Sequence, residues 1–283
     1  MAAGLMDGKW LSEQLMNVQR ERVRVLREMG KNVTLSVVLV GDDMASQTYV
    51  RNKQRACEAL GIESSTLRLP ADISQQALEA KLDALCADES IDGVLLQLPL
   101  PKELSEPSAL AHITPEKDVD GFHIANQGAL FSAREGVVAC TPKGVIHMLK
   151  AYNVPLSGKH AVVVGRSNIV GKPVALLLLN ENCTVTVCHS RTEDLASYTR
   201  QADVLVAAVG RAKMITADMV KEGAAVVDVG INRVDGKLCG DVDFESVKEK
   251  AGYISPVPGG VGKMTVAMLM DNVIGAAEKR MKA

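Results

Sequence analysis

The sequence is poor in aromatic residues, in net charge and in long hydrophobic runs. Trp, Tyr and Phe number 1, 4 and 3 among 283 residues, too few for the aromatic platforms on which single-stranded nucleic acids stack. The 32 basic and 34 acidic residues leave a formal net charge of -2, so there is no positive excess to hold a polyphosphate backbone. No run reaches the roughly 18 apolar residues of a membrane span. These features argue against nucleic-acid and membrane partners.

Closely spaced metal ligands are also missing. The six cysteines are never closer than five positions apart, which excludes Cys-x-x-Cys redox pairs and zinc knuckles. The five histidines show no ligand spacing, so we expect no metal. Asp7 and Lys9 precede any apolar run, which leaves no core for a signal peptide. We therefore expect reduced thiols and a cytoplasmic protein.

What the first half does contain is an alternation of helical and strand patterns. Residues 33–40 and 91–98 are nearly continuous aliphatic runs, typical of strands buried on both faces of a parallel sheet. A shorter strand is predicted around residues 67–69. Helical patterns occupy residues 8–29, 45–60 and 74–86. This βαβ alternation predicts an α/β fold with a right-handed parallel sheet.

The second half repeats this organisation after a proline-rich junction between residues 101 and 144. A helix is predicted at residues 170–180, and a last helix at residues 264–277. The predicted strands are residues 161–164, 184–188, 203–209 and 225–229. With about 150 residues per domain as a guide, 283 residues make two α/β domains.

A turn typical of dinucleotide-binding folds follows the strand at residues 161–164. Gly165 allows a tight turn, Gly171 allows close packing of the next helix on the strand, and Ser167 takes the place usually held by a second glycine. Free amides at the start of that helix would bind a pyrophosphate. The alternative is a helix start that binds no ligand.

The next strand ends at Cys188, where this fold meets the adenosine ribose. An acidic residue there would select NAD, but Ser190 and Arg191 follow instead, with Arg166 nearby. These side chains can bind and neutralise a 2′-phosphate. We therefore predict NADP over NAD, against the alternative that the arginines are only solvated loop charges.

The first half offers reactive side chains at the carboxyl edge of its predicted sheet. Ser46, Tyr49 and Lys53 share one side of the helix that follows the strand at 33–40. Gln97 lies at the end of the strand at 91–98, and Asp118 and Asp120 follow in a loop. Open α/β sheets bind ligands at this edge.

These residues lie in motifs that resemble one family throughout the chain, the bifunctional methylenetetrahydrofolate dehydrogenase/methenyltetrahydrofolate cyclohydrolases. After the motif at residues 256–262 the family usually has proline, where this sequence has Lys263. The matching motifs are GDDMASQTYVRNK (41–53), DGVLLQLPLP (92–101), KDVDGF (117–122), CTPKG (140–144), GRSNIVGKP (165–173), DVGIN (228–232) and PVPGGVG (256–262).

The resemblance implies roles for individual residues. Lys53 would be the acid/base residue of the cyclohydrolase, Gln97 its support, Tyr49 a stacking partner for the folate and Asp120 the residue that holds the pterin. The turn at Pro258, Gly259 and Gly260 would also contact substrate. The cofactor residues would be Gly165, Arg166, Ser167, Ser190, Arg191 and Ile231.

The resemblance also implies an NADP-dependent oxidation of 5,10-methylenetetrahydrofolate, hydrolysis of the product to 10-formyltetrahydrofolate, and a homodimer. The last helix would return to the first domain. We therefore expect a folate-binding domain at residues 1–139 with 264–283 and a Rossmann-type NADP-binding domain at 140–263.

Two other interpretations use the same sequence differently. Another two-domain NADP dehydrogenase would explain Arg166 and Ser190 but would leave Lys53 and Asp120 without a role. A non-catalytic NADP-sensing module would keep the fold alone. An assay with methylenetetrahydrofolate and NADP distinguishes all three.

Overall fold

The computed structural model describes residues 3–282, which form two compact units. One unit contains Gln14–Val138 and the segment from Val266, and we call it the three-stranded unit. The other contains the chain up to Glu13 and Ala139–Thr265, and we call it the six-stranded unit. Among the described residues, no helix is both long enough and apolar enough to cross a membrane.

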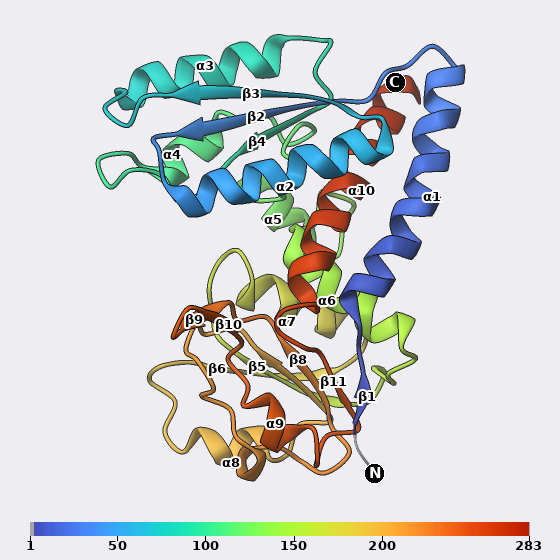
Figure 1. Ribbon diagram of the computed structural model, residues 1–283, viewed down its shortest axis with the longest axis vertical. Coiled ribbons are helices and arrows are strands. Elements are labelled where there is room, and N and C mark those ends of the chain that lie inside the picture. Colours follow the sequence, from blue (N-terminus) through green and yellow to red (C-terminus); the bar gives the residue numbers. More distant parts are fainter. Residues whose placement is uncertain (1–2, 283) are drawn as a thin grey trace. The chain divides into compact units, whose positions relative to one another are not determined.

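The three-stranded unit is built on a parallel sheet with strand order β3-β2-β4. Figure 1 shows helices α2 and α3 beside this sheet. The core joins β2 and β4 to Leu78 and Leu82 of α3, which have no exposed surface. The unit's strands and helices are α1 (Gly8–Glu28, from Gln14), β2 (Thr34–Val40), α2 (Met44–Leu60), β3 (Glu63–Leu69), α3 (Gln75–Ala87), β4 (Gly93–Leu96), α4 (Glu106–Ala111), α5 (Ile124–Phe131) and α10 (Val261–Lys282, from Val266).

Local sequence signals define helix α2. The Asp43 carboxylate accepts a hydrogen bond from the Ser46 amide at 2.7 Å and so caps the helix start. Gly61 ends the helix with φ of 76°, a left-handed conformation that favours glycine. The cap and stop fix which residues of α2 follow the carboxyl end of β2.

A buried carboxylate ties the C-terminal helix to this unit. Asp92, with no exposed surface, contacts the Arg280 guanidinium at 3.1 Å and the Lys31 ammonium at 2.6 Å. It also accepts a hydrogen bond from the Thr34 amide at 3.0 Å. Because these groups come from α10, from the segment before β2 and from β2, one ion cluster joins the end of the chain to the sheet.

The six-stranded unit has a parallel sheet with strand order β1-β11-β8-β7-β5-β6. The chain runs from β5 outward to β6 and then returns to β7 on the other side of β5. Open α/β folds bind ligands at such a reversal. The unit's elements are β1 (Gly4–Leu5), α6 (Cys140–Ala151), β5 (His160–Val164), α7 (Gly171–Asn180), β6 (Thr184–Cys188), α8 (Leu195–Thr199), β7 (Val204–Ala207), η1 (Ala217–Met219), β8 (Ala225–Asp228), β9 (Asn232–Val234), β10 (Lys237–Cys239), α9 (Phe244–Val247) and β11 (Tyr253–Ile254).

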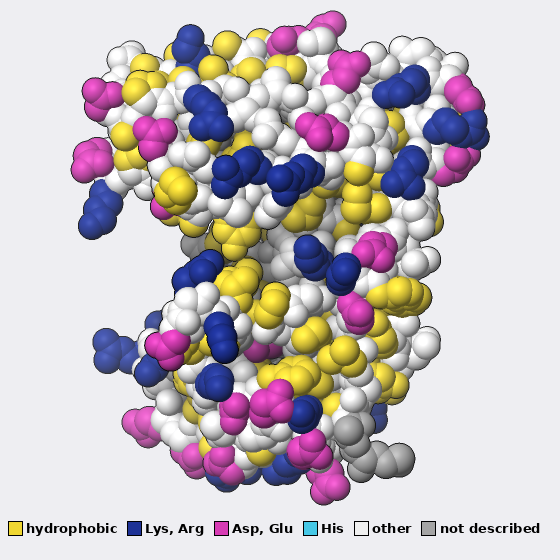
Figure 2. All heavy atoms as spheres, viewed as in Figure 1, with side chains coloured by type: hydrophobic (Ala, Val, Ile, Leu, Met, Phe, Trp, Pro, Cys, Tyr) yellow, Lys and Arg dark blue, Asp and Glu magenta, His cyan; other side chains and the backbone are white. Residues whose placement is uncertain are grey.

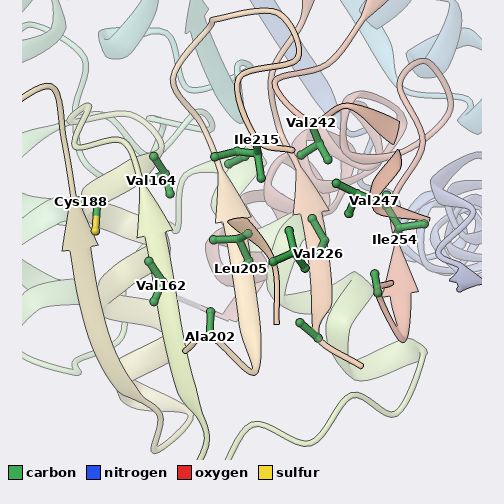
Figure 3. Close-up of a cluster of buried hydrophobic side chains, with 14 residues drawn as sticks. Val162, Val164, Cys188, Ala202, Leu205, Ile215, Val226, Val242, Val247 and Ile254 are labelled. Carbon is green, nitrogen blue, oxygen red and sulfur yellow. The ribbon is translucent and has the colours of Figure 1, made fainter. Parts of the chain in front are cut away.

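The strands of this sheet share a core of small and branched side chains. Figure 3 shows Val162, Leu205 and Val226 projecting from β5, β7 and β8 toward the same cluster. None of the three has exposed surface. The buried aliphatic runs in the sequence are therefore the strands of a two-sided parallel sheet.

The predicted α/β class with two parallel sheets is confirmed. One boundary differs from the expected domains: residues 3–13 pack with the six-stranded unit rather than with the unit that contains Lys53. The reason is that β1 pairs in parallel with β11, and the Lys9 amide donates to the Gly259 carbonyl at 2.9 Å. The expected folate-binding domain placed this segment in the other half of the protein.

Both signs of charge are spread over the surface. Figure 2 shows basic and acidic side chains on the visible face of each unit, in keeping with the net charge of -2. All six cysteines are free. Within residues 3–282, no group of three or more His, Cys, Asp or Glu side chains is arranged to hold a metal ion.

Candidate active site

The centre of the candidate site in the three-stranded unit is a contact between Lys53 and Gln97. Lys53 lies on α2 with only 9% of its surface exposed, and its Nζ donates to Gln97 Oε1 at 3.1 Å. Gln97, which directly follows β4, uses its Nε2 to donate to the Leu98 carbonyl at 2.7 Å. Because the amide nitrogen is engaged, the amide oxygen is oriented toward the amine. The structure thus pairs a buried amine with a neutral acceptor.

The other side chains of the α2 face differ in burial. Tyr49 is 45% exposed, so part of its ring is accessible to a ligand. Ser46 is buried, and within residues 3–282 no group meets the geometry of a hydrogen bond with its Oγ. A buried hydroxyl without a partner is unusual in folded proteins. The sequence placed Ser46, Tyr49 and Lys53 on one side of the helix but could not show that the hydroxyl lacks a partner.

Asp120 lies in a loop held beside β4. The Val94 amide of β4 donates to the Lys117 carbonyl at 2.8 Å, which attaches the start of the loop to the strand that leads to Gln97. Asp120 itself is half-buried. The Asn272 side chain of α10 donates to the carbonyl of Val119, the residue before it, at 2.9 Å.

A second aspartate orders the same loop from within. Asp118 is buried and accepts hydrogen bonds from the amides of Gly121 at 3.1 Å and His123 at 2.8 Å, and from the Asn126 side chain at 2.9 Å. The sequence singled out Asp118 without a role. In the structure it fixes the backbone that follows Asp120.

In the six-stranded unit, the glycine-rich turn after β5 is tightly closed at two glycines. Gly165 has φ of 126°, and a side chain there would begin 2.2 Å from the Ala208 carbonyl oxygen. A side chain on Gly171 would begin 2.3 Å from the Gly165 carbonyl oxygen. Only glycine fits either position. The turn therefore closes tightly on the sheet and leaves its outer side, with Arg166 and Ser167, exposed.

Ser167 does more than replace a glycine. Its Oγ accepts from the amides of Val170 and Gly171, each at 3.2 Å. The hydroxyl thus caps the start of α7 by accepting from two amides of its first turn.

The residues after β6 form the second part of this half-site. The Gly165 amide donates to the Cys188 carbonyl at 2.9 Å, which holds the end of β6 beside the glycine-rich turn. The Arg191 amide donates to His189 Nδ1 at 3.1 Å. Ser190 and Arg191 are exposed, and residues 188–192 include no carboxylate. This set of donors fits a phosphate better than a ribose hydroxyl pair.

The late glycine turn lies beside Ile231. Gly259 has φ of 110°, and a side chain on Gly260 would begin 2.5 Å from the Pro256 carbonyl oxygen. Ile231 is 50% exposed, and its Cδ1 lies 3.7 Å from the position of a Cβ on Gly262. Pro258 is exposed, and its peptide bond to Val257 is cis, as is the bond between Leu98 and Pro99. The Lys263 amide donates to the Gly260 carbonyl at 3.1 Å, a bond that proline cannot make.

Comparison with known proteins places both units in one family. The tetrahydrofolate dehydrogenase/cyclohydrolase catalytic domain matches residues 6–120, and the NAD(P)-binding domain of the same name matches residues 139–281. The bifunctional protein FolD of Halalkalibacterium halodurans is 54% identical over 279 residues, which cover 99% of this chain and 100% of that protein.

Solved structures agree. The bifunctional FolD of Campylobacter jejuni has a TM-score of 0.97 at 50% identity, with 99% of this chain and 100% of that chain covered. The methylenetetrahydrofolate dehydrogenase-cyclohydrolase of Trypanosoma brucei, solved with NADP cofactor and an inhibitor, has a TM-score of 0.95 at 38% identity, with 100% of both chains covered.

Proposed function

The chain belongs to the tetrahydrofolate dehydrogenase/cyclohydrolase family, and on this basis we propose which of its residues perform each of two reactions. It is a bifunctional enzyme of one-carbon metabolism. With NADP it oxidises 5,10-methylenetetrahydrofolate to 5,10-methenyltetrahydrofolate, and it hydrolyses that product to 10-formyltetrahydrofolate. The observation that carries the residue assignment is the buried contact of Lys53 with Gln97.

Lys53 is the acid/base residue of the hydrolysis. In this step water adds to the cationic methenyl carbon, loses a proton, and the five-membered ring then opens to the formyl product. These transfers need a group that can take up a proton and return it. Gln97 orients the Lys53 amine without adding a negative charge that would favour the ammonium form.

Tyr49 and Asp120 hold the folate. The exposed part of the Tyr49 ring offers a flat surface for stacking, one turn before Lys53 on the same helix. The Asp120 carboxylate can accept two parallel hydrogen bonds from the amino and ring N–H groups of a pterin. The hydrogen bonds of Asp118 fix the direction in which this loop presents the Asp120 carboxylate.

Oxidation requires positioning more than a protein base. Bound NADP would supply the acceptor for the hydride of the methylene carbon, and the neighbouring folate nitrogens would stabilise the cation left behind. The chain's own part is to bind and orient. Its cofactor residues are Gly165, Arg166, Ser167, Ser190, Arg191 and Ile231, and Pro258, Gly259 and Gly260 are assigned to substrate binding.

The residues present fit this cofactor. Gly165 and Gly171 leave no space for side chains, so backbone amides can approach a pyrophosphate. Ser190 and Arg191 supply a hydroxyl and a cation where an NAD-selective site would have a carboxylate.

Separate measurement of the two activities of Lys53→Met tests the assignment. We expect the cyclohydrolase to be abolished and most of the hydride transfer to remain, because only hydrolysis needs the amine. Absorbance of NADPH and of the methenyl product, followed together, reports both. An equal loss of the two activities would mean that Lys53 serves binding or structure instead.

We also propose that the enzyme is a cytoplasmic homodimer without nucleic-acid or membrane partners. The free cysteines and the near-neutral charge support the location and the lack of nucleic-acid binding. Light scattering on the purified protein tests the dimer, and a monomer at micromolar concentration would contradict it.

A further inference from the structure

Two buried carboxylates in the six-stranded unit have no part in the function described above. Asp228 ends β8, and Asp241 follows β10. Their exposed fractions are 3% and 0%. A buried carboxylate is costly unless its oxygens are well hydrogen-bonded, so the partners of these two groups indicate what they are for.

Asp241 binds a turn of the backbone. Its Oδ2 accepts from the amides of Val209 at 2.6 Å and Gly210 at 3.0 Å, and its Oδ1 accepts from the Arg211 amide at 2.8 Å. Three consecutive amides thus converge on one side chain. The Oδ1 atom also accepts from the Asn232 side chain at 2.9 Å. One carboxylate therefore joins the loop after β7 to the segment after β8.

Asp228 holds Asp241 in turn. Its Oδ1 accepts from the amides of Gly230 at 3.0 Å and Asp241 at 2.9 Å, and its Oδ2 accepts from the Val242 amide at 2.9 Å. The Asp228 amide itself donates to the Ser255 hydroxyl. Because Asp228 ends the central strand β8, its hydrogen bonds fix the position of Asp241 relative to the sheet.

The surrounding chain is closed around both groups. A Cβ on Gly230 would lie 2.2 Å from the Asp241 Cγ and Oδ1 atoms, and a Cβ on Gly240 would lie 1.8 Å from Asp228 Oδ2. Such separations are far below van der Waals contact. Glycine at both positions is what allows the backbone to approach the carboxylates.

The loops held in this way lie at the carboxyl edge of the sheet. In the strand order, β7 and β8 are on the opposite side of β5 from β6. The adenosine ribose of a dinucleotide meets the end of the strand corresponding to β6, so its other half extends over the ends of β7 and β8. The loop after β7 also contacts the glycine-rich turn, since the Ala208 carbonyl faces Gly165.

We propose that Asp241, held by Asp228, is a positioning residue for the nicotinamide half of bound NADP. This proposal rests on the assignment of the cofactor site above. The Asp241 carboxylate orders residues 209–211 and the segment of Ile231 and Asn232 before the cofactor arrives. Without this carboxylate, three backbone amides would lack their acceptor. Part of the free energy of NADP binding would then be used to order these loops.

Asparagine substitution separates this role from general stability. In Asp241→Asn, the new NH₂ group faces amide donors and cannot accept from them. We expect the Kd of NADP to rise about tenfold, equivalent to ~1.4 kcal/mol. The Kd of 2′,5′-ADP, which carries only the adenosine half, should stay within about twofold of wild type, since ribose and 2′-phosphate bind at the end of β6. Asp228→Asn should act in the same direction.

Two further measurements make the result interpretable. Cyclohydrolase activity, assayed on methenyltetrahydrofolate without NADP, should be retained because its acid/base residue lies in the other unit. Asp243→Asn is the matched control, because Asp243 is close in sequence but makes no side-chain cap to α9. It should leave both dissociation constants unchanged.

The outcomes distinguish the proposal from the cofactor assignment. Unchanged NADP affinity in Asp241→Asn, an equal loss of affinity for NADP and 2′,5′-ADP, or loss of the cyclohydrolase together with cofactor binding would each overturn the positioning role. Arg191→Ala tests the assignment itself and should weaken binding of both ligands. If Arg191→Ala weakens neither, the phosphate site is misassigned, whatever Asp241→Asn shows.

Discussion

Replacing Gln97 by glutamate tests the importance of a neutral partner for Lys53. The change places a negative charge where the amide oxygen now lies, 3.1 Å from Nζ. At an effective dielectric constant of about 20, two unit charges at this distance attract by roughly 5 kcal/mol. Desolvation of the new carboxylate offsets part of this attraction. We take about half of the attraction energy as the net stabilisation of the ammonium form of Lys53.

That stabilisation opposes proton uptake by Lys53 from water. Since each 1.36 kcal/mol in a barrier is a factor of ten in rate, the cyclohydrolase of Gln97→Glu should fall about 100-fold at neutral pH. Hydride transfer needs no protein base, and it should fall by no more than about threefold. The assay follows loss of methenyltetrahydrofolate without NADP and, separately, formation of NADPH from the methylene substrate.

Gln97→Met is the matched control, because it removes the oriented oxygen without adding charge. Its cyclohydrolase should fall about tenfold, as for the loss of one buried hydrogen bond, and the loss should be the same at all pH values tested. The activity of Gln97→Glu should recover as pH rises and the ammonium form loses its proton. Full cyclohydrolase activity of Gln97→Glu at neutral pH would refute the requirement for a neutral partner.

Three further predictions concern the binding residues and the buried carboxylates. Asp120→Asn should lower kcat/KM for folate substrates about 30-fold by removing a charge-assisted hydrogen bond; steady-state kinetics that show no change would contradict the pterin role. Arg191→Ala should raise the Kd of NADP about tenfold and leave that of NAD unaltered, as measured by titration calorimetry. Burial raises the pKa of the Asp228 carboxyl to about 6, above its unfolded value. The contribution of this group to stability is therefore present at low pH and lost as pH rises through about 6. Asp228→Asn should remove this part of the pH dependence, measured as the thermal unfolding midpoint at about pH 5 and 7.5, whereas Asp243→Asn should retain it.

The long elements could be predicted because each has a strong hydrophobic signal. Residues 33–40 were expected as a buried strand, and β2 is Thr34–Val40. The short strands β1 and β11 were not expected, since two residues cannot show a period. Their pairing is what places residues 3–13 in the six-stranded unit. Such a pairing depends on the tertiary structure and leaves no local pattern.

The sequence predicts at which edge of the sheet the candidate site lies, but not how its side chains are oriented. Lys53 lies on the helix that follows one strand, and Gln97 lies at the end of another strand. The alternation of strands and helices therefore places both residues at the same edge of the sheet. The orientation of the Gln97 amide could not be predicted, because it depends on the backbone carbonyl of Leu98. The unpartnered hydroxyl of Ser46 likewise becomes evident only when its surroundings are known.

The roles of the buried carboxylates Asp118 and Asp241 are the hardest to predict from the sequence, and the reason is physical. Asp118 and Asp241 bind mainly backbone amides, which every residue except proline possesses, so no residue type marks their partners. Backbone amides in a folded loop already have fixed directions, so binding them orders no additional side chain. A lysine or arginine partner would lose side-chain entropy and would have to be desolvated. A carboxylate that accepts several amides therefore sets the loop's conformation more narrowly than an ion pair would. Residues such as Asp120 and Ile231 depend on that conformation for their direction, so side chains that touch no ligand can determine how well the ligand is held.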